Sequence, residues 1–437
     1  MTSDNSKTYD VLVVGGGISG MQTALDLADQ DFKVAIIEKD PSIGGKMIRL
    51  DKVFPTLDCA SCITTPKMAS VAHHKNIDIF TMCDIQSLDR EKDIYNIKVE
   101  QKPRYVEPET CIGCRQCEYA CPIMAPDENQ RGLTARKAIY IPFTNAIPQI
   151  ATLDVEYCIL CGKCQKICPT QAVNYLQEPY IFEMEARAVV FAMGYQLIKG
   201  FAERAYGSAS QNPNIIDALQ LERILAPTGP YMRMLRPGDG KEPKKIAFIK
   251  CAGSRDEALG VSYCSRVCCM YSIKNGLLIQ QELPSAEITM FYIDTRAFGK
   301  NYEQFFRNAK DKGIKFIKAK PTISGSGKDR SVIIRYEDQE GPGGVVSEEY
   351  DMAVLCLAMI SALSPNKISE IPVSDDGFMK SSFPKIAPTV TDMEGVFIAG
   401  TISGPKDIVD SIIEAGAAAM EAANYLKSLE QPQAVAA

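Results

Sequence analysis

Apolar residues in the first forty positions fall into two short runs on either side of a helical pattern. Residues 11–14 (VLVV) and 34–37 (VAII) are continuously apolar, as strands are when a parallel sheet is buried on both faces. Between the runs, Met21, Leu25 and Leu27 recur at the spacing of one helix face. The pattern therefore predicts a strand, a helix and a second strand parallel to the first.

The turn between the first strand and the helix is rich in glycine. Gly15, Gly17 and Gly20 follow the order G-x-G-x-x-G, and the second strand ends at Glu38. Glycines in this order allow a tight turn and let a pyrophosphate approach the helix N-terminus, while the acidic residue accepts a hydrogen bond from a ribose hydroxyl. The glycine spacing alone is a weak signal, but its place between strand and helix predicts a dinucleotide site.

Two later apolar segments extend the same unit. Residues 188–195 (AVVFAMGY) read as a strand end, and residues 395–407 (GVFIAGTISGPKD) precede a helix of small residues, IIEAGAAAMEAANYL. The later segment is similar to the strand and helix that close over the flavin in flavoproteins with two dinucleotide-binding domains. Residues 188–195 resemble the A-T-G-Y strand end of the same fold, with Met193 in place of the usual threonine. Together with the loop IGGKM at 43–47, they favour FAD over a lone NAD site.

A second α/β unit is predicted from about Lys244 onward. Its first strand, KKIAFIKC, is followed by a helix near residues 267–282 and by strands within AEITMFYI and GIKFIKA. The unit resembles the one that binds NAD(P)H through a second glycine fingerprint in pyridine-nucleotide-disulfide oxidoreductases. Here the turn reads CAGSR, so we expect the shape of the unit without its nicotinamide site. NADH binding by the degenerate turn is the alternative.

Cysteine is the unusual component of the composition. The 437 residues include 16 cysteines but only two histidines, which favours thiolate ligands for metals over imidazole sites, and over disulfides in a reducing compartment. A net charge of −6 argues against a nucleic-acid surface. No apolar stretch approaches the ~20 residues of a membrane span, and the first residues lack the features of a signal peptide. We therefore expect a cytoplasmic protein with no direct membrane span.

Eight of the cysteines form two copies of one motif. Residues 111–122 (CIGCRQCEYACP) and 158–169 (CILCGKCQKICP) both read C-x2-C-x2-C-x3-C-P. In bacterial two-cluster ferredoxins, the first three thiolates of each run bind one cubane and the fourth binds the other. We therefore predict two 4Fe–4S clusters, one held by Cys111, Cys114, Cys117 and Cys168, and the other by Cys158, Cys161, Cys164 and Cys121.

Four further cysteines form a group with a different spacing, C-x12-C-x3-C-C. Cys251 ends a predicted strand, Cys264 lies in the following loop, and Cys268 and Cys269 open a predicted helix. A strand end, a loop and a helix start can converge on one point, and a helix N-terminus favours thiolates. These four residues are therefore candidates for a third 4Fe–4S cluster, with scattered buried thiols as the alternative.

The remaining cysteines lack a cluster spacing. Cys59 and Cys62 form a C-x2-C within PTLDCASCITTPKM, which fits a redox dithiol, two ligands shared with a partner, or a turn. Cys83 and Cys356 stand alone in apolar surroundings, and we expect both in the core.

As a set, these segments resemble the A subunits of heterodisulfide reductases. The resemblance rests on VVGGGISGMQTALDLAD, PTLDCASCITTPKM, the double cysteine motif, RKAIYIPF, CAGSRD, YCSRVCCMYSIK and GVFIAGTISGPKDI, which together span nearly the whole chain. It implies an α/β fold: a thioredoxin-reductase-like flavoprotein with two dinucleotide domains and an inserted two-cluster ferredoxin domain. It also strengthens the assignment of the third cluster.

The resemblance further implies where the flavin and the domains lie. Lys406 would place a positive charge near the isoalloxazine and stabilise the reduced flavin. The expected FAD contacts are Gly15, Gly17, Ile18, Ser19, Gly20, Glu38, Lys39, Gly44, Gly45, Lys46, Ala192, Gly194, Gly400, Lys406, Asp407 and Ile408. The expected domains are the FAD-binding domain at 8–100, 181–240 and 361–430, the ferredoxin domain at 101–180, and a degenerate NAD-like domain with the third cluster at 241–360.

The function that the resemblance implies is electron transfer. We expect an oxidoreductase subunit with FAD and three 4Fe–4S clusters in a heterodisulfide reductase-like complex. Its partners would be B- and C-like subunits and a redox donor or acceptor, and a homodimer is compatible with this assembly. In the bifurcating members of the family, the flavin splits an electron pair.

Two alternatives stay open. We expect a short form without the N-terminal cluster domain and the C-terminal ferredoxin of longer family members, which is closer to related subunits of quinone-interacting complexes. Transfer without bifurcation to a membrane-linked partner is therefore one alternative. A self-contained NAD(P)H-dependent flavoprotein oxidoreductase is the alternative of another class, and the absent second glycine fingerprint argues against it.

Overall fold

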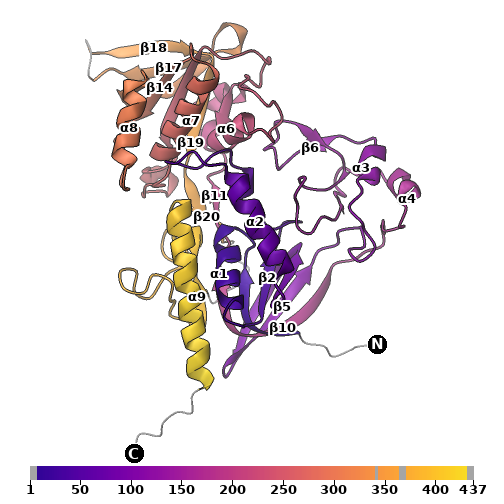
Figure 1. The fold of residues 1–437 in the computed structure, drawn as a ribbon. Coiled ribbons are helices and arrows are strands. Elements are labelled where there is room, and N and C mark those ends of the chain that lie inside the picture. The colour runs from indigo at the N-terminus through magenta and orange to yellow at the C-terminus, as the bar shows by residue number, and fades with distance from the viewer. Residues whose placement is uncertain (1–6, 340–342, 364–370, 431–437) are drawn as a thin grey trace, which may run out of the picture.

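The computed structural model describes residues 7–339, 343–363 and 371–430, which form two sheet-centred units and a lobe at their side (Figure 1). The first unit holds the N-terminal strand and the long C-terminal helix. The second unit lies at the opposite end of the molecule, and the lobe projects from the junction between the two (Figure 1).

The first unit is built on a seven-stranded sheet. Its strand order is β3–β2–β1–β10–β5–β4, and β21 pairs with β10. Strands β1, β2, β3, β10 and β21 are parallel, whereas β4 and β5 form an antiparallel addition. The strands are β1 (Lys7–Val14), β2 (Val34–Glu38), β3 (Ile77–Thr81), β4 (Cys83–Glu91), β5 (Ile94–Gln101), β10 (Tyr180–Phe191) and β21 (Val396–Ile398).

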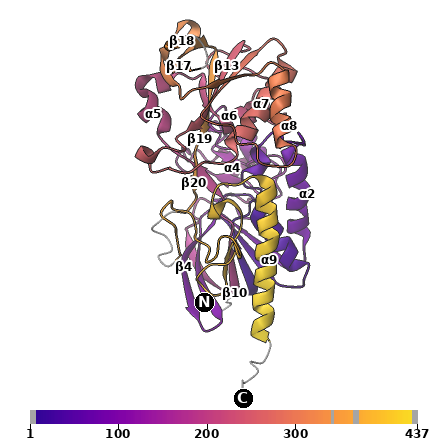
Figure 2. The same ribbon diagram turned by 90° about the vertical axis from the view of Figure 1, so that its left-hand side faces the viewer.

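The helices of this unit within the described residues are α1 (Ile18–Ala28), α2 (Ala60–His73) and α9 (Ile408–Glu430). Helix α9 runs along α1 (Figures 1 and 2), and its alanines at positions 415, 418, 419, 422 and 423 are fully buried. Small side chains allow this close approach, and the Thr23 hydroxyl on α1 donates to the carbonyl oxygen of Ala415 at 3.2 Å. The alanine-rich sequence of α9 is thus explained by the helix against which it packs.

The second unit is a five-stranded parallel sheet with the order β12–β19–β13–β14–β15. Phe248 of β13 packs toward α7, and its neighbour Ile249 packs on the opposite face of the sheet. The main elements are β12 (Ile215–Asp217), α6 (Ala218–Leu225), β13 (Lys245–Ala252), α7 (Cys268–Glu282), β14 (Glu287–Tyr292), α8 (Tyr302–Asp311), β15 (Lys315–Lys318) and β19 (Met352–Leu357).

Smaller elements complete this end of the molecule. They are β11 (Tyr195–Leu197), which pairs with β20 (Met359–Ser361), α5 (Phe201–Tyr206), and the antiparallel sheet of β16 (Thr322–Ser326), β17 (Val332–Glu337) and β18 (Val345–Tyr350). Short 3-10 helices are η1 (Met47–Arg49), η2 (Gly207–Gln211), η3 (Glu257–Leu259), η4 (Lys328–Arg330) and η5 (Gly400–Ser403).

The lobe has a core of its own, in which Val106, Ile139 and Leu153 are buried with two cysteines. It contains two five-residue helices and two short antiparallel pairs of strands. These elements are α3 (Gln116–Ala120), β6 (Ala125–Pro126), β7 (Ala135–Arg136), β8 (Ile139–Tyr140), β9 (Thr152–Leu153) and α4 (Lys163–Ile167).

One domain boundary differs from the sequence prediction. Residues 181–240 were expected to continue the FAD-binding domain, but β12 within this range pairs with β19 and so joins the second sheet. Helix α6, which follows β12 directly, packs against α7 of the same unit. The second unit therefore begins before residue 241. The sequence did not indicate this boundary, because a strand of three residues gives too short an apolar pattern to be assigned to a sheet.

Among the helices of the described ranges, none is long and apolar enough to cross a membrane.

Candidate functional site

The turn between β1 and α1 forms one wall of a cavity. Gly17 is the N-cap of α1, no side chain caps this end, and the first turn carries no acidic residue. Gly17, Ile18 and Ser19 all line the cavity. The first amides of a helix have no partner within the helix, and they attract anionic groups such as a pyrophosphate. This end of α1 therefore fits the phosphates of a dinucleotide.

Two other glycines keep the backbone close around this wall. A Cβ on Gly20 would lie 1.9 Å from the carbonyl oxygen of Gly15, so α1 approaches β1 only because residue 20 has no side chain. Gly45 has a φ of +58°, and a Cβ there would lie 2.8 Å from Cα of Gly17. A larger residue at position 45 would therefore fill the space beside the helix N-terminus.

The cavity has a volume of about 260 Å³ and is lined by residues of both sheet-centred units. Most of the residues expected to contact FAD border it. These are Gly15, Gly17, Ile18, Ser19, Glu38, Lys39, Gly45, Lys46, Ala192, Gly194, Lys406, Asp407 and Ile408.

Three expected contacts, Gly20, Gly44 and Gly400, lie behind the cavity wall. A Cβ on Gly44 would approach the sulfur of Met68 to 3.1 Å, and one on Gly400 would approach the hydroxyl oxygen of Ser19 to 2.2 Å. These glycines thus permit close packing of the elements that form the wall. The glycines at these positions therefore reflect close packing of the wall as much as direct contact with FAD.

Glu38 lies at the end of β2 and links the two loops that border the cavity. Its carboxylate accepts hydrogen bonds from the backbone amides of Gly16 at 2.7 Å and Asp40 at 2.9 Å. Burial, followed by the neighbouring Asp40 carboxylate, raises the pKa of Glu38 from 4.5 to about 7. Each carboxylate oxygen has a second lone pair, so Glu38 can also accept from a ribose hydroxyl.

Lys406 lines the cavity but is tied to an acidic partner. Its ammonium group donates to Glu414 at 2.5 and 2.6 Å and to the Ser403 hydroxyl at 2.6 Å. Burial lowers the pKa of Lys406, and the Glu414 carboxylate opposes that shift. Glu414 also accepts from the amide of Gly400 at 3.2 Å. Any field that Lys406 exerts on a flavin is therefore partly offset by Glu414, which the sequence prediction did not include.

Sequence reasoning also missed a buried ion pair in the cavity wall. Lys274 of α7 and Glu222 of α6 meet at 2.5 Å with side chains only 1% and 5% exposed. Both residues line the cavity, and the Asp51 backbone amide donates to Glu222 at 3.1 Å. The two partners are 52 residues apart in the chain, so no local pattern points to them.

In the lobe, the structure brings together the cysteines predicted to hold the first cluster. Cys111, Cys114, Cys117 and Cys168 line one small cavity. The Ala172 amide donates to the Cys168 sulfur at 3.3 Å, and hydrogen bonds of this kind tune cluster potentials. The cavity draws three thiols from one cysteine run and the fourth from the other, as the ferredoxin pattern requires.

The second predicted set lies in the same lobe. Cys164 and Cys121 are buried in the lobe core, and Cys158 packs against it. The Cys164 sulfur lies 3.0 Å from the hydroxyl of Tyr175. Burial raises the pKa of Tyr175, and the nearby thiols of Cys164, Cys158 and Cys161 add to this shift. All four residues are free thiols.

The cysteines of the third group come from a strand end, a loop and a helix start. Cys251 has a φ of +56° at an irregularity in the register of β13, and Cys268 and Cys269 are the first residues of α7. The neighbouring thiols of Cys251 and Cys269, together with burial, raise the pKa of the Cys268 thiol well above its ordinary value. Cys264 lies in the loop before α7, where its sulfur accepts from the Arg266 amide at 3.3 Å. Its thiol interacts electrostatically with those of Cys251 and Cys269.

A buried cation, Lys250, lies beside this group. Lys250 is 5% exposed, and its ammonium group has no hydrogen-bond partner among the described residues. It lies 5.1 Å from the ring centroid of Phe316 and 5.8 Å from that of Tyr292, and its charge acts on Cys269. Burying an uncompensated charge is costly. A cluster on these cysteines, which carries negative charge, would supply the missing partner.

No three or more histidine, cysteine, aspartate or glutamate side chains of the described residues form a site for a single metal ion. That arrangement differs from the ligand set of a cubane, in which each thiolate binds a separate iron at its own corner.

The four remaining cysteines lie outside these three groups. Cys83 and Cys356 are each 1% exposed, which confirms their predicted burial, and Cys83 also lines the large cavity. Cys59 and Cys62 form a disulfide at the start of α2.

Two family models match parts of the chain. One is the FAD dependent oxidoreductase family at residues 10–48, and the other is the 4Fe-4S dicluster domain at residues 110–172. These matches show a flavin-dependent domain and an inserted dicluster ferredoxin domain, as predicted.

Solved structures share the fold. Thioredoxin reductase from T. acidophilum superimposes with a TM-score of 0.53 at 15% identity, covering 97% of this chain and all of that one. The enzyme from Lactococcus lactis gives a TM-score of 0.53 at 11% identity, covering 96% of this chain and 99% of that one. The predicted thioredoxin-reductase-like α/β fold is therefore confirmed.

Curated relatives cover nearly the whole chain. The A subunit of H2:CoB-CoM heterodisulfide,ferredoxin reductase from Methanothermobacter thermautotrophicus is 43% identical over 94% of this chain and 63% of its own length. The second iron-sulfur A subunit of CoB–CoM heterodisulfide reductase from Methanopyrus kandleri is 44% identical over 97% of this chain and 65% of its own length. The chain thus spans less than two thirds of these relatives. Over the residues that it shares with them, the chain is similar to the A subunits of heterodisulfide reductases.

Proposed function

We propose that the chain is an electron-transfer subunit of a heterodisulfide reductase-like complex, with FAD in the large cavity and three 4Fe–4S clusters on the three cysteine groups. FAD supplies the exchange between two-electron and one-electron chemistry, and the clusters supply one-electron steps. The chain itself binds these groups, orders them and sets their potentials.

One observation supports this proposal above the others: helix α7 borders both the cavity and the third cysteine group. Cys268 and Cys269 are its first two residues. Val267, Tyr271 and Lys274 lie on one helical face and line the cavity. A single rigid element therefore holds the proposed cluster next to the proposed flavin, at the place where related folds bind a nicotinamide.

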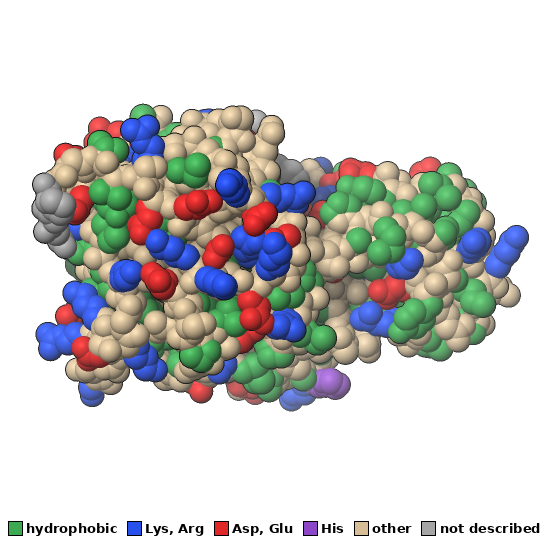
Figure 3. Space-filling view, turned by 90° about the horizontal axis from the view of Figure 1, so that it is seen from above, with side chains coloured by type: hydrophobic (Ala, Val, Ile, Leu, Met, Phe, Trp, Pro, Cys, Tyr) green, Lys and Arg blue, Asp and Glu red, His purple; other side chains and the backbone are tan. Residues whose placement is uncertain are grey.

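The lobe is suited to exchange electrons with another protein. Cys114 and Cys161 are exposed, and large apolar side chains around the two cysteine runs are exposed as well. They are Ile112 (67%), Tyr119 (81%), Met124 (60%), Ile159 (62%), Leu160 (70%) and Leu176 (88%). Figure 3 shows this lobe at the right, with apolar side chains gathered on its surface. Apolar patches of this kind mark contact sites for partners, here other subunits or a redox carrier.

Cofactor content tests the proposal directly. Anaerobically purified chain should contain one FAD and about 12 irons, four for each of three clusters. Cys268→Ala should lose about four irons and one EPR signal, while FAD and the dicluster signals persist. The matched control is Cys356→Ala, which removes a buried thiol from the same core and should leave the iron content unchanged.

Two results would contradict the proposal. Full iron content in Cys268→Ala would remove the third cluster. Rapid bleaching of the flavin by NADH in the isolated chain would instead favour a self-contained NAD(P)H-dependent oxidoreductase. Redox titration of the flavin distinguishes a bifurcating subunit from one that transfers electrons without bifurcation. Crossed one-electron flavin potentials are expected for bifurcation, and ordered potentials for simple transfer.

A further inference from the structure

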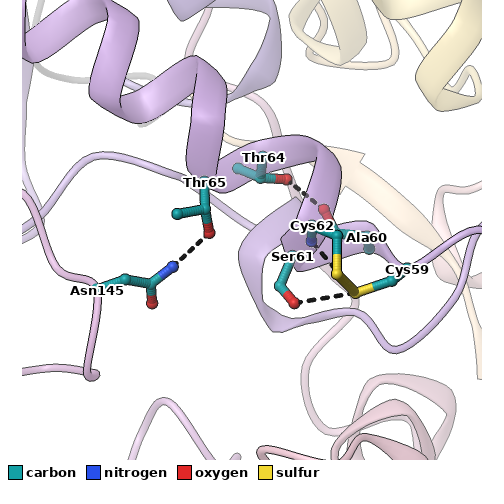
Figure 4. Close-up of a disulfide and its surroundings, with 7 residues drawn as sticks. All are labelled: Cys59, Ala60, Ser61, Cys62, Thr64, Thr65 and Asn145. Atoms are coloured by element: carbon teal, nitrogen blue, oxygen red, sulfur yellow. Dashed lines mark hydrogen bonds between the residues drawn. A yellow bond between two sulfur atoms is a disulfide. The ribbon is translucent and has the colours of Figure 1, made fainter.

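Cys59 and Cys62 do not line the cavity and do not belong to the three cysteine groups. The two residues form a disulfide across a C-x2-C at the start of α2, with their Cα atoms 5.2 Å apart (Figure 4). The other cysteines are free thiols. We propose that Cys59 and Cys62 form a thiol–disulfide exchange site, at which Cys62 is attacked by an external thiolate and Cys59 is the leaving thiolate.

The two sulfurs differ in access. Cys62 is exposed, as is the neighbouring Ile63 at 38%. Cys59 is only partly exposed and is followed by Ala60, which is fully buried. An external thiolate therefore reaches Cys62 more readily than Cys59. The exposed apolar side chain of Ile63 adds a surface that a thiol-bearing partner can contact.

The two sulfurs also differ in how well they can carry negative charge. Cys59 is the N-cap of the 14-residue helix α2, and its sulfur accepts a hydrogen bond from the Cys62 amide at 3.2 Å. The Ser61 hydroxyl lies 3.3 Å from the same sulfur. No acidic residue lies in the first turn of α2. A helix N-terminus stabilises a thiolate, so Cys59 is the better leaving group.

The start of α2 is fixed from several sides, which keeps both sulfurs in place when the disulfide opens. The amide of Ala60 donates to the Asp51 carbonyl oxygen at 2.9 Å, and the Thr64 hydroxyl donates to the Ala60 carbonyl oxygen at 2.8 Å. Thr65 is hydrogen-bonded to Asn145, which lies in the lobe between β8 and β9 (Figure 4). The dithiol form is therefore held ready to close again.

The position also places the pair next to the flavin cavity. Cys59 forms a β-bridge with Lys52, and Lys52, Val53 and Phe54 line the cavity. The exchange site thus lies on the outer side of a loop whose inner side faces the proposed flavin.

The exchange balances as a two-electron reduction by a dithiol. The thiolate of the external dithiol forms a bond to the Cys62 sulfur as the Cys59–Cys62 bond breaks, and the electron pair leaves on Cys59. The second thiol of the reductant then attacks the mixed disulfide and releases Cys62 as a thiolate. The external dithiol becomes a disulfide, and its two protons pass to the two cysteines or to water.

Single-cysteine variants of the cofactor-loaded chain test this assignment under anaerobic conditions. Glutathione disulfide is the probe, and the modified peptide is identified by mass spectrometry. In Cys59→Ser, Cys62 should form a mixed disulfide at least about tenfold faster than Cys59 does in Cys62→Ser, because the Cys62 sulfur is accessible and because the stabilised thiolate of Cys59 is the weaker nucleophile. The Cys59→Ser/Cys62→Ser double variant gives the background from all other thiols.

The unmodified chain provides a second measurement that needs no substitution. Incubation with dithiothreitol, an external dithiol, followed by acid quenching and alkylation should label Cys59 and Cys62 together, and oxidised dithiothreitol should remove the label. Resistance to dithiothreitol, or equal reactivity of the two cysteines, would overturn the proposal.

Iron and FAD contents of the same samples separate this proposal from the proposed function. If Cys59→Ser or Cys62→Ser loses iron, the pair consists of cluster ligands and the exchange assignment is wrong. If both variants keep wild-type iron and FAD but fail to exchange, the exchange site alone is refuted. Loss of cofactors in the unmodified chain would instead contradict the electron-transfer proposal.

Discussion

The buried ion pair between Lys274 and Glu222 gives a prediction whose size follows from burial. Lys274→Met removes the cation and leaves the Glu222 carboxylate 5% exposed, with the Asp51 amide as its remaining hydrogen-bond donor. Removing one partner of a buried pair costs about 3–5 kcal/mol, because the other charge stays buried without compensation. We therefore expect the free energy of unfolding to fall by that amount.

The double variant Lys274→Met/Glu222→Gln distinguishes two costs: the loss of the ion pair and the burial of an unpaired Glu222 carboxylate. A neutral amide at position 222 can still accept from the Asp51 amide and no longer carries a charge. The double variant should therefore be more stable than Lys274→Met alone, and the coupling energy between the two substitutions should be at least about 1 kcal/mol. Additive effects of the two substitutions would refute the reasoning.

Anaerobic urea unfolding followed by far-UV circular dichroism measures these differences at equal FAD and iron loading. The matched control is Lys315→Met, which breaks an exposed ion pair of the same sheet-centred unit. Lys315 lies 3.0 Å from Glu287, and their side chains are 59% and 57% exposed. Exposed pairs contribute little because water screens them, so this variant should unfold close to the wild-type midpoint. An unfolding midpoint of Lys274→Met equal to that of Lys315→Met would contradict the buried-charge argument.

Three further predictions address the cofactor sites. Gly20→Ala should yield folded chain without FAD, because its Cβ would lie 1.9 Å from the Gly15 carbonyl oxygen. Flavin absorbance per chain measures the loss of FAD. The control is Gly325→Ala, because a Cβ at position 325 meets nothing within 4 Å. Lys250→Met should lower the reduction potential of the proposed third cluster in an EPR-monitored redox titration, because a buried positive charge favours the reduced, more negative state. An unchanged potential would show that Lys250 does not face this cluster. In FAD-free chain, the raised pKa of Glu38, about 7 against an ordinary 4.5, means that the native state binds more protons between these values. Stability should therefore fall as the pH rises through this window, thermal unfolding at several pH values measures the fall, and Glu38→Gln should remove it.

Sequence patterns predicted the features that depend on neighbours in the chain. The strand–turn–helix around Gly15, Gly17 and Gly20 follows from local apolar periodicity and from glycine spacing. The helix at 267–282 and the cysteines that open it were placed within one residue of α7. Cysteine spacing within each run carries the same kind of local information, because three corners of a cubane are bound by a short loop.

Part of what sequence reasoning missed depends on contacts between distant segments. The ion pair of Lys274 with Glu222 arises only when separate segments pack together. Glu414, by contrast, lies only 8 residues after Lys406, and the turn before α9 brings the two side chains together. Gly400 fits a flavin-site pattern, yet its lack of a side chain accommodates Ser19, almost 400 residues earlier in the chain. Such residues carry no local signature, because either partner alone looks like an ordinary surface charge or turn residue.

Helix α7 has a consequence for the rate of electron exchange. Because an α-helix rises 1.5 Å per residue, Tyr271 and Lys274 lie only about 4.5 and 9 Å along the helix axis from Cys268. The separation between the proposed flavin and the proposed third cluster is therefore fixed by covalent geometry within one chain, independent of how the complex assembles. The lobe would reach the proposed partners through an exposed surface, so its rate of electron exchange would vary with docking. The step along α7 would run at the same rate in the isolated chain and in the proposed complex.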